Sequence, residues 1–212
     1  AMYLEAPALD RPTGSVAWAS GKTKLLAAAY APSDARRPRL KPDRAVVDLN
    51  LRPSHGMPTP RERALEAHLA SALDHLVLTA RYPRTTIAVI VQVLCDDGSL
   101  LSAALHAACA ALRHAGVELR GLGGGCTIAL TPTGAALLDP TADEERDAAT
   151  LLSLAFLTPG GGGGDDADDA TGEPSLLLSQ VGGSDFGPFG GISVAEHEQL
   201  MRAAKAAAAA VA

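Results

Sequence analysis

The chain has 212 residues, 47% of them hydrophobic, which is enough for one large or two small domains with a packed core. Its 18 Lys and Arg against 24 Asp and Glu give a net charge of −6, which argues against a protein that binds DNA by charge alone. Three cysteines without paired spacing exclude a disulfide framework and a Cys-rich zinc site. No pattern predicts a membrane-spanning helix or a secretory signal, so we expect a soluble intracellular protein with no membrane partner.

Charge is distributed unevenly along the chain. Residues 1–120 carry 15 basic and 11 acidic side chains, a net of +4, whereas residues 121–212 carry 3 basic and 13 acidic side chains, a net of −10. This asymmetry predicts a basic face in the first half and an acidic site or tail in the second. The Gly- and Asp-rich residues 159–174 explain part of it, and we expect them to form a disordered loop within the domain.

Strand patterns dominate the first fifty residues. Residues 14–31 predict two strands around the small-residue turn Ser20-Gly21-Lys22. A third strand is expected at 45–51, ending at Arg52-Pro53 because proline cannot continue a ladder. A loop then leads to residue 60.

A helix is predicted at residues 60–79. Thr59 is placed to cap it and Pro60 to open its first turn. Four leucines recur every three or four residues and form one apolar stripe that must be buried; they are Leu65, Leu69, Leu73 and Leu76.

The clearest unit is a strand, an acidic turn and a helix. Residues 86–94 form a nearly continuous apolar run rich in β-branched residues, the pattern of a central strand covered on both faces. The turn Asp96-Asp97-Gly98-Ser99 leads to a helix at 99–115, capped by Ser99 or Asp97. Beyond it we expect strands at 126–131, 134–139, 150–158 and 175–181, and an alanine-rich helix from 193 with a Ser193–Glu196 capping box.

These elements predict a single domain of α/β (α+β) class over residues 1–212. One mixed sheet with helices packed on it accounts for all of them. No internal repeat is visible, and no linker divides the chain into two cores.

Acidic residues follow the strand that ends at Asp139. Asp143, Glu144, Glu145 and Asp147 lie within the next eight residues, and carboxylates at a strand end can hold Mg²⁺. A solvated acidic turn is the alternative reading of the same run.

Two further groups can bind phosphate. The helix that begins at Ser99 offers free amides to an anion, although such turns are common in proteins that bind nothing. Arginines surround the loop before the first helix, namely Arg52, Arg61 and Arg63, with Arg81 and Arg84 at the far end of that helix. Such a patch could bind the phosphates of a nucleic-acid backbone. The same arginines could equally form a solvent-exposed helix face with no ligand.

Histidines and cysteines give mainly negative indications. The six histidines show no metal-binding spacing, and a lone histidine is usually structural or solvated. Cys95 and Cys109 fall in an apolar strand and an apolar helix, so we expect both to be buried and inert; the position of Cys126 stays open.

The order of these segments resembles the RNase PH family, from about residue 10 to 205. The resemblance rests on GSVAWASGKTKLLAAAY, LRPSHGMPTPRER, TIAVIVQVLCDDGSLLSAALHAACAALRHAG and LLDPTADEE. The short loop before the first helix and the TADEE segment resemble the RNase PH-like ring subunits of the eukaryotic RNA exosome more than the bacterial enzyme. The resemblance implies a β-α-β-α domain that pairs and builds six-membered rings around an RNA channel.

Active members of this family cleave RNA from the 3′ end with inorganic phosphate. Their arginine grip on RNA is matched by Arg61 but not by Ala67, where a second arginine is expected. Their phosphate turn carries Thr and Arg where this chain has Leu100 and Leu101, which leaves Ser99, Ser102 and the helix amides to hold an anion weakly. Asp139 and Glu145 match the carboxylate pair for the metal and the general acid. The resemblance therefore implies impaired phosphorolysis.

The leading expectation is an exosome subunit that contributes to 3′-to-5′ RNA processing and degradation by ring assembly and RNA binding. Its expected partners are single-stranded RNA, held by Arg52, Arg61, Arg63 and Arg84, and other RNase PH-like subunits, with a homodimer when isolated. The nucleus, nucleolus and cytoplasm are its expected compartments.

Two other functions stay open. The first is a metal-dependent 3′–5′ nuclease acting on RNA, possibly also DNA, or a residual phosphorolytic exoribonuclease, in which Asp139 and Glu145 act with Mg²⁺ and inorganic phosphate would be the co-substrate. The second is a plain α/β interaction module with no role in nucleic-acid binding.

Overall fold

A computed structural model describes residues 2–34, 41–158, 174–182 and 194–211. The strands are β1 (Met2–Glu5), β2 (Gly14–Ser20), β3 (Thr23–Asp34), β4 (Val46–Arg52), β5 (Thr85–Cys95), β6 (Leu122–Leu130), β7 (Ala136–Leu138), β8 (Thr150–Thr158) and β9 (Ser175–Gly182). The helices are α1 (Pro60–Leu76), α2 (Leu100–His114), α3 (Ala142–Asp147) and α4 (Val194–Val211), with a short 3₁₀ helix at Thr79–Arg81. None of the described helices is both long and apolar enough to cross a membrane.

The strands form two sheets, so the expectation of one mixed sheet is wrong. The first has the order β1-β2-β3-β5-β4, with β4 and β5 parallel and the other neighbours antiparallel. The second, β7-β6-β8-β9, is antiparallel throughout. Strand patterns identify strands but not the sheet that each one joins.

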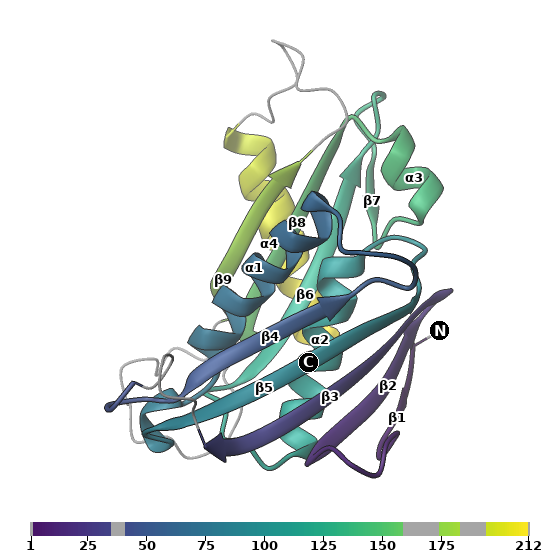
Figure 1. Ribbon diagram of the computed structural model, residues 1–212. Helices are drawn as coiled ribbons and strands as arrows, with labels where there is room; N and C mark the ends of the chain where they lie inside the picture. Colours follow the sequence, from purple (N-terminus) through teal and green to yellow (C-terminus); the bar gives the residue numbers. More distant parts are fainter. Residues whose placement is uncertain (1, 35–40, 159–173, 183–193, 212) are drawn as a thin grey trace.

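Four layers result, in the order sheet, helices, sheet, helix (Figure 1). Helix α2 contacts β2 and β3 on one side and β6 and β8 on the other, and α1 lies beside it against β4 and β9. Helix α4 covers the far face of the second sheet, where Ala204 packs with Ile128 and Phe156. This is the α/β architecture of β-α-β-α type that the resemblance implies.

Helix α2 is buried on nearly all sides because its residues are small or aliphatic. The glycine-rich start of β6 lets the second sheet approach it closely. A Cβ on Gly125 would lie 2.8 Å from the Ser102 Cα, and one on Gly123 would lie 2.8 Å from the Cys109 Sγ. The strand therefore begins at Leu122, four residues before its predicted start, because these glycines belong to it.

Helix α1 confirms the predicted stripe: Leu65, Leu69, Leu73 and Leu76 are all buried. Its N-terminus carries a complete capping box between Thr59 and Glu62. The helix ends at Leu76, three residues before the predicted end, because Val77 is extended and forms a β-bridge with Leu119.

Strand β5 departs from its prediction on one face. Ile87, Val89, Val91 and Val93 point into the core, while the alternate residues are only half-buried and Leu94 and Cys95 are exposed. The expectation of cover on both faces is therefore wrong, as is the expectation that Cys95 is buried. Cys109 and Cys126 are buried, and burial raises the pKa of both thiols to about 12.

The other predicted strands and the C-terminal helix form, whereas strand β1 and helix α3 were not predicted. The hairpin at Gly21 forms and joins β2 to β3, and the strands expected at 126–131 and 134–139 pair as β6 and β7. The alanine-rich tail is helical from Val194. Ser193 of the expected capping box and residues 159–173 of the expected disordered loop lie outside the described residues.

Candidate functional site

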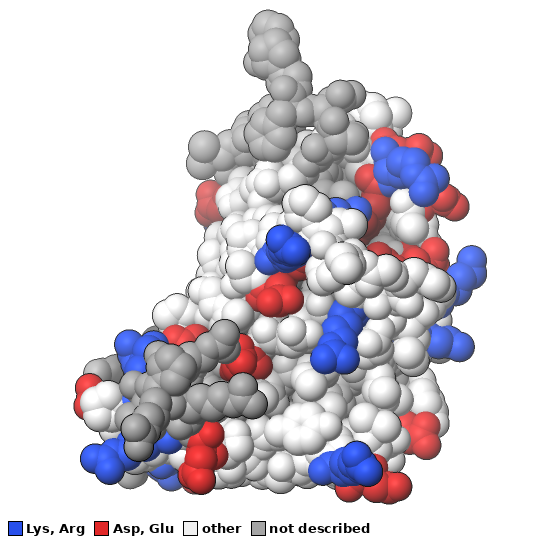
Figure 2. Space-filling view, viewed as in Figure 1, with Lys and Arg blue, Asp and Glu red and all other residues white. Residues whose placement is uncertain are grey.

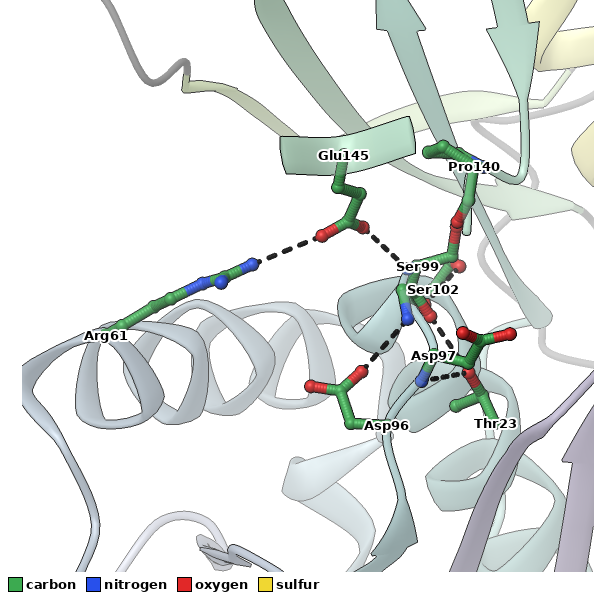
Figure 3. Close-up of polar contacts among 9 residues, drawn as sticks. Thr23, Arg61, Asp96, Asp97, Ser99, Ser102, Pro140 and Glu145 are labelled. Atoms are coloured by element: carbon green, nitrogen blue, oxygen red, sulfur yellow. Dashed lines mark hydrogen bonds and ion pairs between the residues drawn. The ribbon is translucent and has the colours of Figure 1, made fainter. Parts of the chain in front are cut away.

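The turn between β5 and α2 is held by strand β3 and by its own acidic residue. Thr23 Oγ1 accepts a hydrogen bond from the Asp97 N–H at 3.0 Å and donates one to the Gly98 carbonyl at 3.1 Å. The Asp96 carboxylate accepts from the Gly98 N–H at 3.1 Å. Figure 3 shows these contacts at the start of α2. Together they fix where the first amides of the helix point.

Ser99 occupies the N-cap position of α2 without acting as a side-chain cap. Its backbone is left-handed, with φ +52°, and no side-chain cap hydrogen bond forms. Its hydroxyl instead donates to the Pro140 carbonyl at 3.2 Å, and the Ser102 hydroxyl donates to the Ser99 carbonyl at 2.8 Å. The two hydroxyls expected to bind phosphate thus direct their protons to backbone carbonyls.

Glu145 reaches this turn from α3. Its Oε1 accepts a hydrogen bond from the Ser99 N–H at 2.6 Å, and its Oε2 lies 3.3 Å from Arg61 Nη2 at the first turn of α1 (Figure 3). The Glu145 side chain is 13% exposed and that of Arg61 is 75% exposed. A carboxylate from the chain itself therefore occupies the Ser99 amide at the α2 N-terminus.

Asp139 follows β7 in a left-handed conformation, with φ +52°. Desolvation raises the pKa of Asp139, and the neighbouring Ser99 side chain partly offsets that rise. Asp139 and Glu145 thus both contact Ser99, but they line different cavities, each of about 490 Å³, that share Gly98 in their walls. The structure brings the pair to one residue without directing both carboxylates into one pocket.

The cavity beside Glu145 has an apolar wall at the start of α2. Leu100 and Leu101 are 9% and 5% exposed and line this cavity together with Arg61. They occupy the positions where the resemblance expects Thr and Arg. A phosphate entering here would meet methyl groups in place of a hydroxyl and a guanidinium.

A polar row on the second sheet lines the same cavity and was missed by sequence reasoning. Thr127, Ser153 and Gln180 lie side by side on β6, β8 and β9. The buried Thr127 Oγ1 and Gln180 Oε1 find no hydrogen-bond partner among the described residues. The alternation Gly125, Thr127, Ala129 could have indicated that Thr127 points toward α2, but only once the register of β6 was known.

Trp18 and His106 form the inner wall of the cavity that contains Asp139. Their ring centroids lie 5.3 Å apart, and His106 Nε2 accepts a hydrogen bond from the Gly125 N–H at 2.9 Å. Desolvation lowers the pKa of His106 to about 4. His106 is therefore neutral and structural.

The arginines fall at two ends of the first sheet. Arg52 ends β4, and the loop after it leads to Arg61 and Arg63 on α1. Arg84 precedes β5, eight residues before Gln92, which pairs with Arg52; at 3.3 Å per residue this is about 26 Å away. Arg81 pairs with Glu118 at 2.6 Å. Arg52, Arg61 and Arg63 thus share one end, and Arg84 lies at the other.

No continuous basic stripe is seen on the face in Figure 2. Its Lys and Arg side chains stand in small groups, most of them next to Asp or Glu. The expected basic face is therefore divided into small patches on this side of the molecule.

The carboxylates suit Mg²⁺ poorly as a pair in this arrangement. Both Glu145 oxygens already have partners, one being the Arg61 cation. Among the described residues, no three His, Cys, Asp or Glu side chains cluster to hold a metal ion.

Comparison with known proteins shows the family. The 3′ exoribonuclease family, domain 1 (RNase PH) matches residues 1–118, more than half of the chain. The chain belongs to the RNase PH family. It is 36% identical over 148 residues to the "Exosome complex exonuclease RRP46 homolog" of Oryza sativa, covering 70% of this chain and 62% of that protein. It is 34% identical to the "Exosome complex component Rrp41" of Methanopyrus kandleri, covering 76% of this chain and 70% of that protein.

Solved structures agree with this assignment. The crystal structure of rice Rrp46 matches with a TM-score of 0.84 and 27% identity, covering 100% of this chain and 90% of that one. An archaeal exosome core matches with a TM-score of 0.78 at 18% identity, a likeness of fold. The chain spans about 62% of the length of the plant RRP46 homologs that it matches.

Proposed function

We propose that this chain is an RNase PH-like subunit of the RNA exosome. It contributes to 3′-to-5′ RNA processing and degradation by joining a ring and contacting RNA, with phosphorolysis impaired. The proposal is supported by relatives named as exosome components and by the match of the whole chain to rice Rrp46. As an exosome subunit it acts in the nucleus, including the nucleolus, and in the cytoplasm.

The apolar wall at the start of α2 carries the proposal that phosphorolysis is impaired. The side chains of Leu100 and Leu101 offer no donor, and the Ser99 and Ser102 hydroxyls donate to carbonyls. Each charge-assisted hydrogen bond missing from a bound phosphate costs about 1.5–3 kcal/mol. Losing a bidentate arginine therefore weakens phosphate binding by orders of magnitude.

Apolar side chains at the edge of the first sheet support ring or dimer formation. Strand β1 is an edge strand, and its Met2, Tyr3 and Leu4 are 49%, 60% and 49% exposed. Exposed edges with apolar side chains pair readily with other chains. We infer that β1 faces another RNase PH-like subunit in the ring, or a second copy of this chain when it is isolated.

The arginines at the end of β4 and the start of α1 support RNA binding. Arg52 and Arg63 project at the surface near Arg61, where they can contact successive phosphates, and the distant Arg84 would need a longer RNA. Aromatic residues make up 3% of the chain, which favours backbone contacts over base stacking. Binding should therefore be tolerant of sequence and weaken as salt rises.

Residual catalysis at Asp139 is a second candidate. A carboxyl with a raised pKa beside a cleft suits a proton donor to a leaving oxygen. Mg²⁺ would take Asp139 and Glu145 as ligands only after Glu145 leaves Arg61, and inorganic phosphate would serve as co-substrate only in the phosphorolytic form.

Ring assembly gives the test of this function. On native mass spectrometry, the wild-type chain should form hetero-oligomers with other RNase PH-like exosome subunits. Leu4→Asp should weaken that assembly about tenfold or more, because it places a charge on the apolar edge. Met57→Asp is the control, since Met57 is 88% exposed on the loop before α1. A wild-type chain that stays monomeric with every subunit offered would refute the proposal.

A further inference from the structure

We propose that Glu145 takes the place of the phosphate anion at the start of α2. The cleft then excludes inorganic phosphate, while Arg61 can still leave Glu145 and bind an RNA phosphate. This inference rests on the proposed function and names the residue that sets the anion specificity of the same site. Glu145 positions Arg61 and determines which anion the site accepts, and it is not a catalytic residue.

The contacts of Glu145 are those that a bound anion would make. A helix N-terminus attracts negative charge through its free amides and its dipole. Here the Ser99 N–H donates to Glu145 Oε1 at 2.6 Å, a short charge-assisted hydrogen bond. Arg61 Nη2 lies 3.3 Å from Glu145 Oε2. One carboxylate thus joins a helix amide to the arginine that matches the family's RNA grip (Figure 3).

The carboxylate is fixed in place by its own helix. Thr141 and Glu144 form a capping box at the start of α3, and the Ser99 hydroxyl ties the same segment to α2 through Pro140. Glu145 is largely covered, whereas Arg61 is mostly exposed. An anion that approaches α2 therefore meets a fixed negative charge, but Arg61 is free to swing outward.

This difference in mobility affects the binding of inorganic phosphate and of RNA differently. Inorganic phosphate at the start of α2 would use the Ser99 amide, which the Glu145 carboxylate already occupies, and it would lie beside that negative charge. An RNA phosphate at the rim needs only the guanidinium, and it competes with Glu145 for Arg61. The arrangement permits RNA binding at a reduced affinity and opposes phosphate binding in the cleft.

Two substitutions of Glu145 separate charge from occupancy. Glu145→Ala removes the carboxylate and opens the Ser99 amide, whereas Glu145→Gln keeps an acceptor for that amide and removes only the charge. We expect inorganic phosphate, titrated by calorimetry at constant ionic strength, to bind Glu145→Ala about tenfold tighter than wild type, with Glu145→Gln in between. Phosphate should also raise the melting temperature of Glu145→Ala but not that of the wild type.

Asp143→Asn is the matched control. It removes one negative charge from the same helix, where Asp143 pairs only with the exposed Arg146 in the described contacts, and it leaves Ser99 and Arg61 untouched. Phosphate affinity that is equal in wild type, Glu145→Ala and Asp143→Asn would overturn the proposal. An equal gain in Glu145→Ala and Asp143→Asn would also overturn it, because general charge would then explain the effect.

The RNA arm tests the role of Arg61. Glu145→Gln should bind a short oligo-adenylate RNA several-fold tighter at low salt, without Mg²⁺, and the gain should vanish in the Arg61→Gln/Glu145→Gln double variant. A gain that persists without Arg61, or weaker RNA binding in Glu145→Gln, would contradict the proposal. Phosphate and RNA binding are measured on the isolated chain, so they can fail while ring assembly succeeds, and the reverse.

Discussion

Gly98→Ala is expected to lower the free energy of unfolding by about 2–4 kcal/mol. Gly98 has φ +96°, a backbone conformation that alanine adopts only with strain. An added Cβ would also lie less than 3.0 Å from backbone atoms of Pro140, Thr141 and Ala142. The α2 turn and the segment leading to α3 must then separate, which pulls Glu145 away from the Ser99 amide. Urea unfolding of the variant measures the loss.

Gly134→Ala is the matched control for Gly98→Ala. Its φ is +84°, but nothing lies within 4 Å of the added Cβ. It should cost only about 1–2 kcal/mol, the strain of the backbone alone. Equal losses in the two variants would show that the α2 turn does not pack closely against residues 140–142.

Acid is expected to destabilise the protein through His106, by about 3 kcal/mol between pH 6.5 and pH 4. Desolvation lowers the pKa of His106 in the folded state from 6.5 to about 4. Below pH 6.5 the His106 ring binds a proton in the unfolded chain but stays neutral in the folded chain. The stability contributed by the neutral ring is therefore complete above pH 6.5 and is lost as the pH falls toward 4.

His106→Gln should flatten this part of the pH profile. Glutamine keeps an acceptor for the Gly125 N–H but does not titrate. His55→Gln, the same substitution at an exposed histidine, is the control. Urea unfolding at a series of pH values measures both slopes, and equal slopes in wild type and His106→Gln would disprove the role of His106.

Local chemistry explains why much of the fold could be predicted. Thr59, Pro60 and the leucine stripe define α1 without reference to the rest of the chain, because capping and helical periodicity are local. The hairpin at Gly21 is local in the same sense. The end of α1 was misplaced because the bridge of Val77 to Leu119 joins residues 42 positions apart.

The arrangement of the site depends on contacts that no pattern reveals. The resemblance implies that Asp139 and Glu145 act as a pair, but Asp139 is left-handed and Glu145 lies on helix α3, and their side chains line different cavities. Ser99 or Asp97 was expected to cap α2, yet the Ser99 side chain and amide contact Pro140 and Glu145, more than 40 residues away. The two sheets, likewise, are defined by the position of α2 between them.

Analysis of RNA products tests the central claim most directly. The purified chain is incubated with 3′-labelled single-stranded RNA, with and without inorganic phosphate and Mg²⁺, and products are separated by charge, with Asp139→Asn in parallel. We predict RNA binding without phosphate-dependent release of nucleoside diphosphates. Monophosphates that require Mg²⁺ and Asp139 would show hydrolysis in place of phosphorolysis. Rapid release of nucleoside diphosphates only when phosphate is present would contradict the account, because Leu100 and Leu101 would then line a working phosphate site.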